Sequence, residues 1–328
     1  MKCLITNDIH LGVSRNDSIW LDQTVKLIEQ IIDECHKREI WTLYILGDFF
    51  DDRKNLYMKT LDTALRIAEL LKKNTITTKI LLGNHDVFYK TENTINSLEI
   101  FNEYDNIEVI KNTKVVDNVG IVPWNCEIPK DVEYLFGHFE INEFPVTNTR
   151  IFDKSNLNIS NFSQYKKVIS GHFHIPSSRQ NITYLGAPFH LSFNDVGGTR
   201  GFYYFDSDID QLEFIEFNGV RFVYVSSEEI PDVKKIENNV VRLIFEKDYG
   251  TVENNKKIEK VQSCSPLRFH TDFSKLSNEI SIDEQETSGQ TMKSNKEILF
   301  DFIDSGDHPP HIEPKKMKNI IETLLEVV

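Results

Sequence analysis

Short apolar runs alternate with longer segments of periodic hydrophobicity along the first 110 residues. In the longer segments apolar residues recur every three or four positions, which is typical of amphipathic helices, whereas the short runs are typical of buried strands. The pattern predicts helices at residues 22–38, 58–73 and 92–104, and strands at residues 2–6, 41–46, 79–82 and 107–110. Alternation of this kind predicts a layered α/β domain.

The next hundred residues follow a different pattern, because strand-like runs succeed one another with few helical segments between them. We expect strands at residues 120–123, 133–136, 167–170, 183–185, 201–205 and 212–217. A β-rich half of this kind predicts a second sheet packed against the first. The predicted fold class is therefore α/β with two stacked sheets.

The C-terminal third begins with a polar stretch at residues 226–239. A strand at 240–246, a helix at 252–261 and a strand at 267–271 then predict a small α/β appendage. Residues 274–296 are rich in Ser, Asn, Glu, Gln and Thr, which is typical of a linker. Two short helical pieces follow, and the last is amphipathic, with an apolar face at Met317, Ile320, Ile321 and Leu324. We therefore divide the chain into residues 1–225, 226–273, 274–296 and 297–328.

Composition and charge argue against some classes of protein. The 328 residues carry a net charge of −14. Because contacts with phosphate groups need positively charged side chains, we do not expect the whole protein surface to bind nucleic acid. None of the four cysteines forms a Cys-x-x-Cys pair, which favours a reducing compartment and argues against a structural zinc site. We recognise neither a signal peptide nor an apolar run of the ~20 residues that span a bilayer. The expected location is cytoplasmic.

Five polar clusters each follow a predicted strand. Their members that can bind a metal ion or act in catalysis are Asp8, His10, Asp48, Asn84, His85, His138, His172 and His174. In open α/β sheets, ligands bind beyond the carboxyl ends of the strands, so we expect these side chains to converge at one edge. Five of the ten histidines lie in these clusters, and the other five, at 36, 190, 270, 308 and 311, are predicted to be surface or packing residues.

The mixture of carboxylate, amide oxygen and imidazole suits a pair of divalent cations, with Mn²⁺ favoured and Mg²⁺ an alternative. Two cations need a bridging anion, and Asp48 is the natural bridge. Water held between them becomes hydroxide at neutral pH and can attack phosphorus in line. A single Asp-x-His occurs often by chance, so the prediction depends on the joint pattern.

The ordered motifs D-x-H, G-D-x-x-D, G-N-H-D, G-H and G-H-x-H resemble those of the calcineurin-like metallophosphoesterase superfamily, over residues 1–225. Within it, the stretch from Tyr184-Leu185-Gly186-Ala187-Pro188 to Arg200-Gly201-Phe202 resembles the SbcD-type and phage recombination nuclease subunit. This resemblance implies a two-sheet sandwich flanked by helices, a small α/β capping domain at 226–273, and an ATPase-binding helical segment at 297–328.

The resemblance also implies roles for individual residues. The first cation would be held by Asp8, His10, Asp48 and His174, and the second by Asp48, Asn84, His138 and His172. His85 would face the scissile phosphate, with Asp86 orienting it. Some cellular relatives have a second catalytic histidine where this chain has Asp51, so Asp51 is a catalytic candidate of open role.

The activity implied is that of a metal-dependent DNA exonuclease and endonuclease subunit, acting in recombination, replication and repair. Its implied partners are DNA, an SMC-like ABC ATPase bound through the Met317, Ile320, Ile321 and Leu324 face, and a second copy of the chain. Phosphates could be contacted by Arg53, Lys54 and Arg200, although a loop exposed to solvent explains the first two equally well. Trp124 could stack on a base, but a packed tryptophan is the simpler interpretation.

Two other functions are consistent with the sequence. A phosphatase or cyclic-nucleotide phosphodiesterase of the same superfamily would use the same ligands, and the stretch from Tyr184 to Gly201 and the C-terminal appendages argue against it. A non-catalytic scaffold would have no need of a complete ligand set, so the intact motifs argue against that function.

Overall fold

Strand β1 (Lys2–Thr6) lies in the middle of a six-stranded sheet, and the sheet's order is β14-β13-β1-β2-β3-β4. The computed structural model describes residues 1–89, 91–147, 150–229, 232–275, 303, 316 and 318. Parallel to β1 run β2 (Thr42–Leu46), β3 (Thr77–Leu81) and β4 (Ile107–Ile110). On its other side, β13 (Gly201–Asp206) and β14 (Gln211–Glu216) are antiparallel additions from late in the chain.

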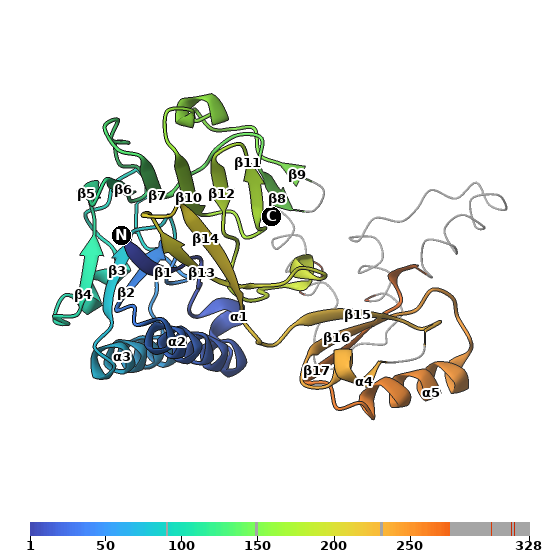
Figure 1. The fold of residues 1–328 in the computed structure, drawn as a ribbon. Helices are drawn as coiled ribbons and strands as arrows, with labels where there is room; N and C mark the ends of the chain where they lie inside the picture. The colour runs from blue at the N-terminus through green and yellow to red at the C-terminus, as the bar shows by residue number, and fades with distance from the viewer. Residues whose placement is uncertain are drawn as a thin grey trace. The chain divides into compact units, whose positions relative to one another are not determined.

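Helices α2 (Ser18–Arg38) and α3 (Met58–Lys73) lie side by side against one face of this sheet (Figure 1). The Asp17 carboxylate caps α2 by accepting a hydrogen bond from the Ile19 amide, which starts the helix four residues earlier than the periodicity predicted. A short α1 (Val13–Asn16) precedes it. The predicted bounds of α3 are confirmed.

A second six-stranded sheet has the order β11-β12-β10-β7-β6-β5. Its strands are β5 (Lys114–Val116), β6 (Val119–Val122), β7 (Tyr134–His138), β10 (Lys167–Gly171), β11 (Ser177–Arg179) and β12 (Ile182–Tyr184). The strands β6, β7, β10 and β12 are parallel, and β5 and β11 close the two edges in the antiparallel sense. The predicted pair of stacked sheets is therefore confirmed.

Alternation along each strand assigns side chains to different layers of the core. Leu4 packs under the helices, whereas its neighbours Cys3 and Ile5 face the second sheet and meet Phe136 and Ile169 there. The far face of the second sheet is covered by loops, the short 3₁₀ helix η2 (Ile159–Phe162) and the two-stranded β8 (Pro145–Thr147) and β9 (Arg150–Ile151), rather than by long helices.

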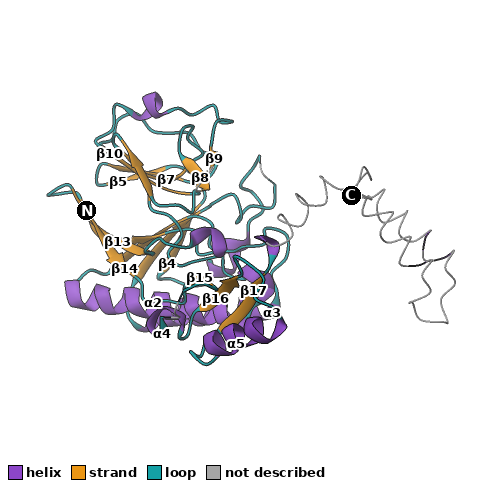
Figure 2. Ribbon diagram, turned by 90° about the vertical axis from the view of Figure 1, so that its right-hand side faces the viewer, coloured by secondary structure: helices purple, strands orange, loops and turns teal. Residues whose placement is uncertain are grey.

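Three parallel strands form a smaller sheet, in the order β15 (Phe222–Ser226), β16 (Val240–Ile244) and β17 (Arg268–Asp272). Helix α4 (Val233–Ile236) connects β15 to β16, and α5 (Thr251–Gln262) connects β16 to β17; Figure 2 shows both helices beside these strands. The predicted boundary at 226 falls at the last residue of β15, a strand that the sequence did not predict. Because β15 pairs with β16, the small sheet begins before that boundary.

The chain divides into two compact units, residues 1–244 with 249–272, and residues 245–248 with 273–328. In the second unit the Phe245 and Phe273 rings stack 4.3 Å apart. The predicted linker and ATPase-binding segment lie almost wholly outside the described residues, and so do Met317, Ile320, Ile321 and Leu324. No helix in the described part of the chain is long and apolar enough to span a bilayer.

The helix predicted at residues 92–104 is wrong, because only the 3₁₀ helix η1 (Ser97–Phe101) forms there. The preceding residues pair in a hairpin-like manner, with the Phe88 amide donating to the Ile95 carbonyl. The Asn93 side-chain amide donates to the Lys111 and Trp124 carbonyls, which ties the loop to the neighbouring chain. These tertiary contacts hold the backbone of the segment in a non-helical conformation.

A buried ion pair fixes the loop between β12 and β13. Arg200 donates to Asp195 Oδ1 at 2.8 Å, and both side chains are less than a tenth exposed. The second oxygen, Oδ2, accepts the Leu191 and Ser192 amides. Asp195 is the last residue of the 3₁₀ helix η3 (Phe193–Asp195), and Arg200 follows in the loop. Because the ion pair buries the Arg200 side chain, this residue is not exposed for the predicted phosphate contact.

Asp195→Ala should destabilise the fold by about 3–5 kcal/mol, because it leaves the Arg200 charge buried without its partner. Urea unfolding followed by circular dichroism measures the change. Glu216→Ala is the matched control, since it removes the exposed Glu216–Arg221 pair and should cost less than about 1 kcal/mol. Equal losses in the two variants would contradict the structural role given to the buried pair.

Candidate metal centre

The carboxyl ends of β1, β2 and β3 lie along one edge of the first sheet, and the residues that follow each strand turn toward the second sheet. Asp8 and His10 follow β1, Asp48 follows β2, and Asn84 with His85 follow β3. His138 ends β7, and His172 and His174 follow β10. The two sheets meet here, because the Asp8 carboxylate accepts the His172 amide at 2.9 and 3.0 Å.

Close backbone approach at this edge requires glycine at two turns. A Cβ on Gly83 would lie 2.2 Å from the Asp48 amide nitrogen and from Asp48 Oδ1. Gly47 has φ of +85°, and a Cβ there would lie 2.4 Å from His138 Nδ1. Any side chain at either position would push the polar residues apart.

Four of the predicted ligands have left-handed backbone. Their φ values are 45° at Asp8, 48° at His10, 50° at Asp48 and 93° at His172. Such conformations are costly for residues other than glycine and persist where surrounding bonds determine them. Here the Asp8 and His10 amides donate to the Gly47 and Asp48 carbonyls, which locks the turns after β1 and β2 together.

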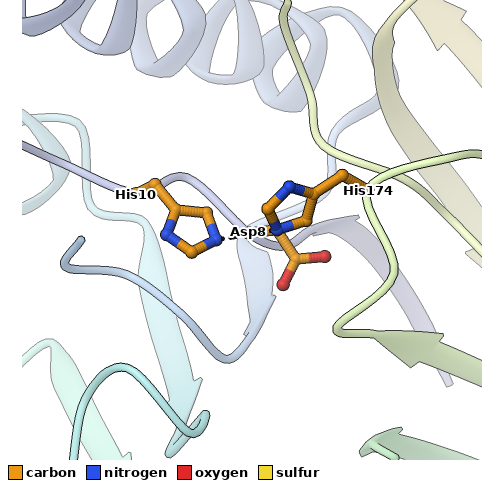
Figure 3. A group of neighbouring side chains, drawn as sticks. All are labelled: Asp8, His10 and His174. Atoms are coloured by element: carbon orange, nitrogen blue, oxygen red, sulfur yellow. Dashed lines mark hydrogen bonds between the residues drawn. The ribbon is translucent and has the colours of Figure 1, made fainter. Parts of the chain in front are cut away.

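The first group of candidate ligands is Asp8, His10 and His174, whose donor atoms lie within 4.8 Å of one another (Figure 3). His10 Nε2 and His174 Nε2 are 2.9 Å apart. His10 Nε2 is also 3.7 Å from Asp48 Oδ2. This is the grouping predicted for the first cation.

The second group is Asp48, His138 and His172, with Asn84 between them. His138 Nε2 lies 2.9 Å from Asn84 Oδ1 and 3.3 Å from Asp48 Oδ2. His172 Nδ1 lies 2.8 Å from Asn84 Oδ1 and 3.3 Å from His138 Nε2. These four side chains are the ones predicted for the second cation.

The second group consists of electron-pair donors that face one another. His138 Nδ1 donates to the Leu46 carbonyl at 2.8 Å, so a neutral ring presents a bare Nε2. His172 Nε2 faces the Glu140 carboxylate at 3.2 Å, which favours the hydrogen on Nε2 and leaves Nδ1 bare. Oxygen and nitrogen lone pairs at these separations repel unless a proton or a metal cation lies between them. The donor set therefore fits a divalent cation.

The pKa values of the carboxylates and imidazoles in the two groups are strongly shifted. Burial opposes the charged form of His138, but Asp48 and Asp8 outweigh it and raise the pKa of His138 to about 9. Burial likewise opposes ionisation of Asp48, yet His138 and His10 lower its pKa well below the ordinary range. Burial raises the pKa of Asp8 and lowers that of His174. The cluster thus attracts positive charge, and a cation would displace protons from it.

His85 projects beside the first group, with its ring 4.9 Å from that of His10. Its Nδ1 donates to the Asp51 carbonyl at 2.6 Å, which leaves Nε2 available to a substrate. Burial lowers the pKa of His85, so the free ring is mainly neutral. The Asp51 carboxylate lies 3.2 Å from His10 Nδ1, so Asp51 faces two histidines, His85 through its backbone carbonyl and His10 through its carboxylate.

Asp86 does not orient His85, contrary to expectation, because a different group, the Asp51 carbonyl, holds the His85 ring. Asp86 is fully buried, and its carboxylate accepts the amides of Phe49, Phe50 and Gly83. Burial raises its pKa to about 7. Asp86 therefore ties the loops after β2 and β3 together, which places Asp48 opposite Asn84.

The predicted phosphate-binding residues lie in different environments. Arg53 is close enough to His85 for its charge to contribute to the lowered pKa of that ring. Lys54 is exposed on the same loop, where its amide donates to Asp52. Arg200 is buried against Asp195 and is not brought to the metal centre. Arg53 and Lys54 remain the candidates for substrate phosphates.

Three residues that contact the ligands were not assigned to the site from the sequence. Asn7 is buried, and its amide donates to Asp8 Oδ2 at 2.6 Å and to the Gly186 carbonyl at 3.0 Å. Trp124 stacks on the His172 ring at 5.5 Å, so it packs against a ligand. Glu140 meets the same ring at its edge. Asn7 and Glu140 each adjoin a motif, and only that proximity could have indicated them.

Comparison with known proteins gives three results. Residues 1–226 match the family described as calcineurin-like phosphoesterase. Exonuclease subunit 1 of Enterobacteria phage T4 is 33% identical over 230 residues, which cover 66% of this chain and 67% of that protein. Metallophosphoesterase 1 of Danio rerio is 27% identical over 148 residues, or 40% of this chain and 38% of that protein.

Among solved structures, one described as a novel archaeal phosphodiesterase has 13% identity and a TM-score of 0.35, and it covers 66% of this chain and 100% of that chain. The family match spans more than half of the sequence and contains every candidate ligand. The chain therefore belongs to the calcineurin-like phosphoesterases, a family of metal-dependent phosphoester hydrolases.

Proposed function

We propose that this protein is the nuclease subunit of a DNA-processing complex and cleaves phosphodiester bonds as an exonuclease and endonuclease. The observation that carries the proposal is the meeting of seven side chains that could bind metal, which follow or end strands of two sheets and form two groups around Asp48. Similarity to a phage exonuclease subunit over two-thirds of the chain supports DNA as the substrate.

Two divalent cations fit the donor set, held by Asp8, His10, Asp48 and His174 on one side and by Asp48, Asn84, His138 and His172 on the other. When bound, such a pair supplies an activated water and neutralises charge on the phosphate. We favour Mn²⁺, because four imidazoles and one amide oxygen accompany only two carboxylates, whereas Mg²⁺ prefers sites made of oxygen alone.

His85 would act on the substrate through Nε2. The Asp51 carbonyl holds Nδ1, so the ring has one orientation before substrate arrives. The free ring is mainly neutral because burial lowers its pKa, but a phosphodiester anion beside Nε2 would favour the protonated form. The protonated ring can stabilise charge on the phosphate or give its proton to the leaving oxygen.

The net charge of −14 leaves little of the surface suited to a DNA backbone. Arg53 and Lys54 offer cations beside His85, and a partner would supply the rest. We propose that residues 297–328 dock an SMC-like ABC ATPase through Met317, Ile320, Ile321 and Leu324. Residues 226–273 would act as a capping domain, which a linker at 274–296 joins to the docking segment. The chain would work as a homodimer. Such a complex would act in recombination, replication and repair in the cytoplasm of a phage host.

The purified chain should release nucleotides from linear DNA in the presence of Mn²⁺ and lose this activity in EDTA, because the proposed site needs both cations. The measurement compares this release with hydrolysis of a generic aryl phosphate under the same conditions. Rapid aryl phosphate hydrolysis with intact DNA would favour a phosphatase, and absence of bound metal by elemental analysis would favour a non-catalytic scaffold.

His85→Asn should keep Mn²⁺ binding and lower the rate of DNA cleavage by roughly 10²–10⁴-fold, since the side chain acts on substrate rather than on the cations. Asp48→Ala is the matched variant, because it removes the shared ligand and should lose both metal and activity. If His85→Asn retained Mn²⁺ and cleaved as fast as wild type, the proposed role of this ring would be wrong.

A large ATPase should co-purify with the full chain from cells that express both, and deletion of residues 313–328 should abolish the association. The amphipathic face in this segment is the reason, since helix-in-groove docking buries such a face. Replacing Met317 and Leu324 with Ala tests the same face without shortening the chain. Unchanged recovery of the ATPase with the deleted chain would contradict the docking proposal.

A further inference from the structure

Glu140 lies at the edge of the proposed metal centre. Its Oε1 is 3.2 Å from His172 Nε2, while the other ring nitrogen of His172 points into the ligand group at Asn84 and His138. The imidazole thus lies between a carboxylate on one side and the metal-binding atoms on the other. A proton on Nε2 satisfies the carboxylate and leaves the Nδ1 lone pair directed at the cation position.

The position of Glu140 is fixed by the backbone on either side of it. The Phe139 amide donates to Ser170 Oγ at 3.0 Å. The Tyr184 hydroxyl donates to the Phe139 carbonyl at 2.9 Å and accepts the Ile141 amide at 3.1 Å. Phe139 and Ile141 are buried in the core of the second sheet, whereas Glu140 between them is only partly buried.

His172 is held from two further directions. Its amide donates to both oxygens of Asp8, which supports the left-handed backbone at φ of 93°. Trp124 covers one face of the ring at 5.5 Å and 28°. These contacts fix the backbone and the ring plane, but neither determines which nitrogen carries the hydrogen. Glu140 favours the hydrogen on Nε2. Asn84 Oδ1, 2.8 Å from Nδ1, would favour the other tautomer in the metal-free site, and a cation bound by both atoms would remove that preference.

We propose that Glu140 is a positioning residue, which holds His172 with its hydrogen on Nε2 and its Nδ1 lone pair toward the second cation. The proposal rests on the metal centre of the proposed function and specifies how one of its ligands is prepared. Carboxylates that bond to the outer nitrogen of a ligand histidine fix the ring and raise its basicity, and their loss typically weakens metal affinity 10–100-fold.

Glu140→Ala in the full chain tests the proposal, with Mn²⁺ binding followed by isothermal titration calorimetry and by electron paramagnetic resonance of the ion pair. Wild type is expected to bind two ions, and Glu140→Ala to bind one of them about 10–100-fold more weakly, with loss of the coupled-pair signal. Glu143→Ala is the matched control, because Glu143 is three residues away, is 59% exposed at its side chain and lies 3.9 Å from Arg179. This control should match wild type.

The thermal midpoint of the metal-free protein separates positioning from folding, and Glu140→Ala should lie within about 2 °C of wild type, because a partly exposed ion pair contributes little to stability. If the midpoint falls further, Glu140→Gln tests the proposal instead, because glutamine keeps the side-chain volume of glutamate. This variant should still bind one ion several-fold more weakly than wild type does. Wild-type affinity for both ions in the folded variant would overturn the proposal. Failure of wild type itself to bind two ions would instead overturn the proposed function.

Discussion

Burial of carboxylates and imidazoles where the two sheets meet is the constraint on which the rest of this structure depends. Asp8, Asp48 and His138 are almost fully buried, and their mutual attraction only partly offsets the loss of hydration. Neutral rings would present bare nitrogens to acceptor oxygens, so the arrangement needs positive charge, which a proton on His138 supplies and a cation could supply in its place. The hydrophobic layers on both sides of the sheets provide the free energy that offsets the cost of this burial.

The same constraint accounts for the unusual backbone. A donor set drawn from five separate turns converges only if the chain leaves each strand sharply, and four of the ligands adopt left-handed conformations to do so. Asp86 helps to hold this backbone in place, because its carboxylate accepts hydrogen bonds from three amides in two loops. In the described hydrogen bonds, its carboxylate contacts no candidate metal-binding atom. Catalytic geometry here depends on residues that serve only the backbone.

Much of the fold was predictable because local signals agreed with the tertiary structure. The periodicity of α3 and the apolar runs of β1 and β4 are strong, and their predicted bounds are those observed. The ligand motifs were recognisable because each follows a strand. Residues 92–104 were mispredicted because the Asn93 side chain bonds to backbone distant in sequence, at Lys111 and Trp124. Contacts such as Glu140 with His172 depend on the packing of β7 against β10, which no local pattern encodes.

The pairing of β1 with β13 has a consequence for biosynthesis. The first ligands to leave the ribosome, Asp8 and His10, follow a strand whose antiparallel partner lies about 200 residues later, and the amide that Asp8 binds is that of His172. At roughly 5–20 residues per second, translation takes about 10–40 s to supply that partner. Until then the edge of β1 that pairs with β13 stays unpaired, and the two groups of candidate ligands cannot assemble before His172 and His174 have been made.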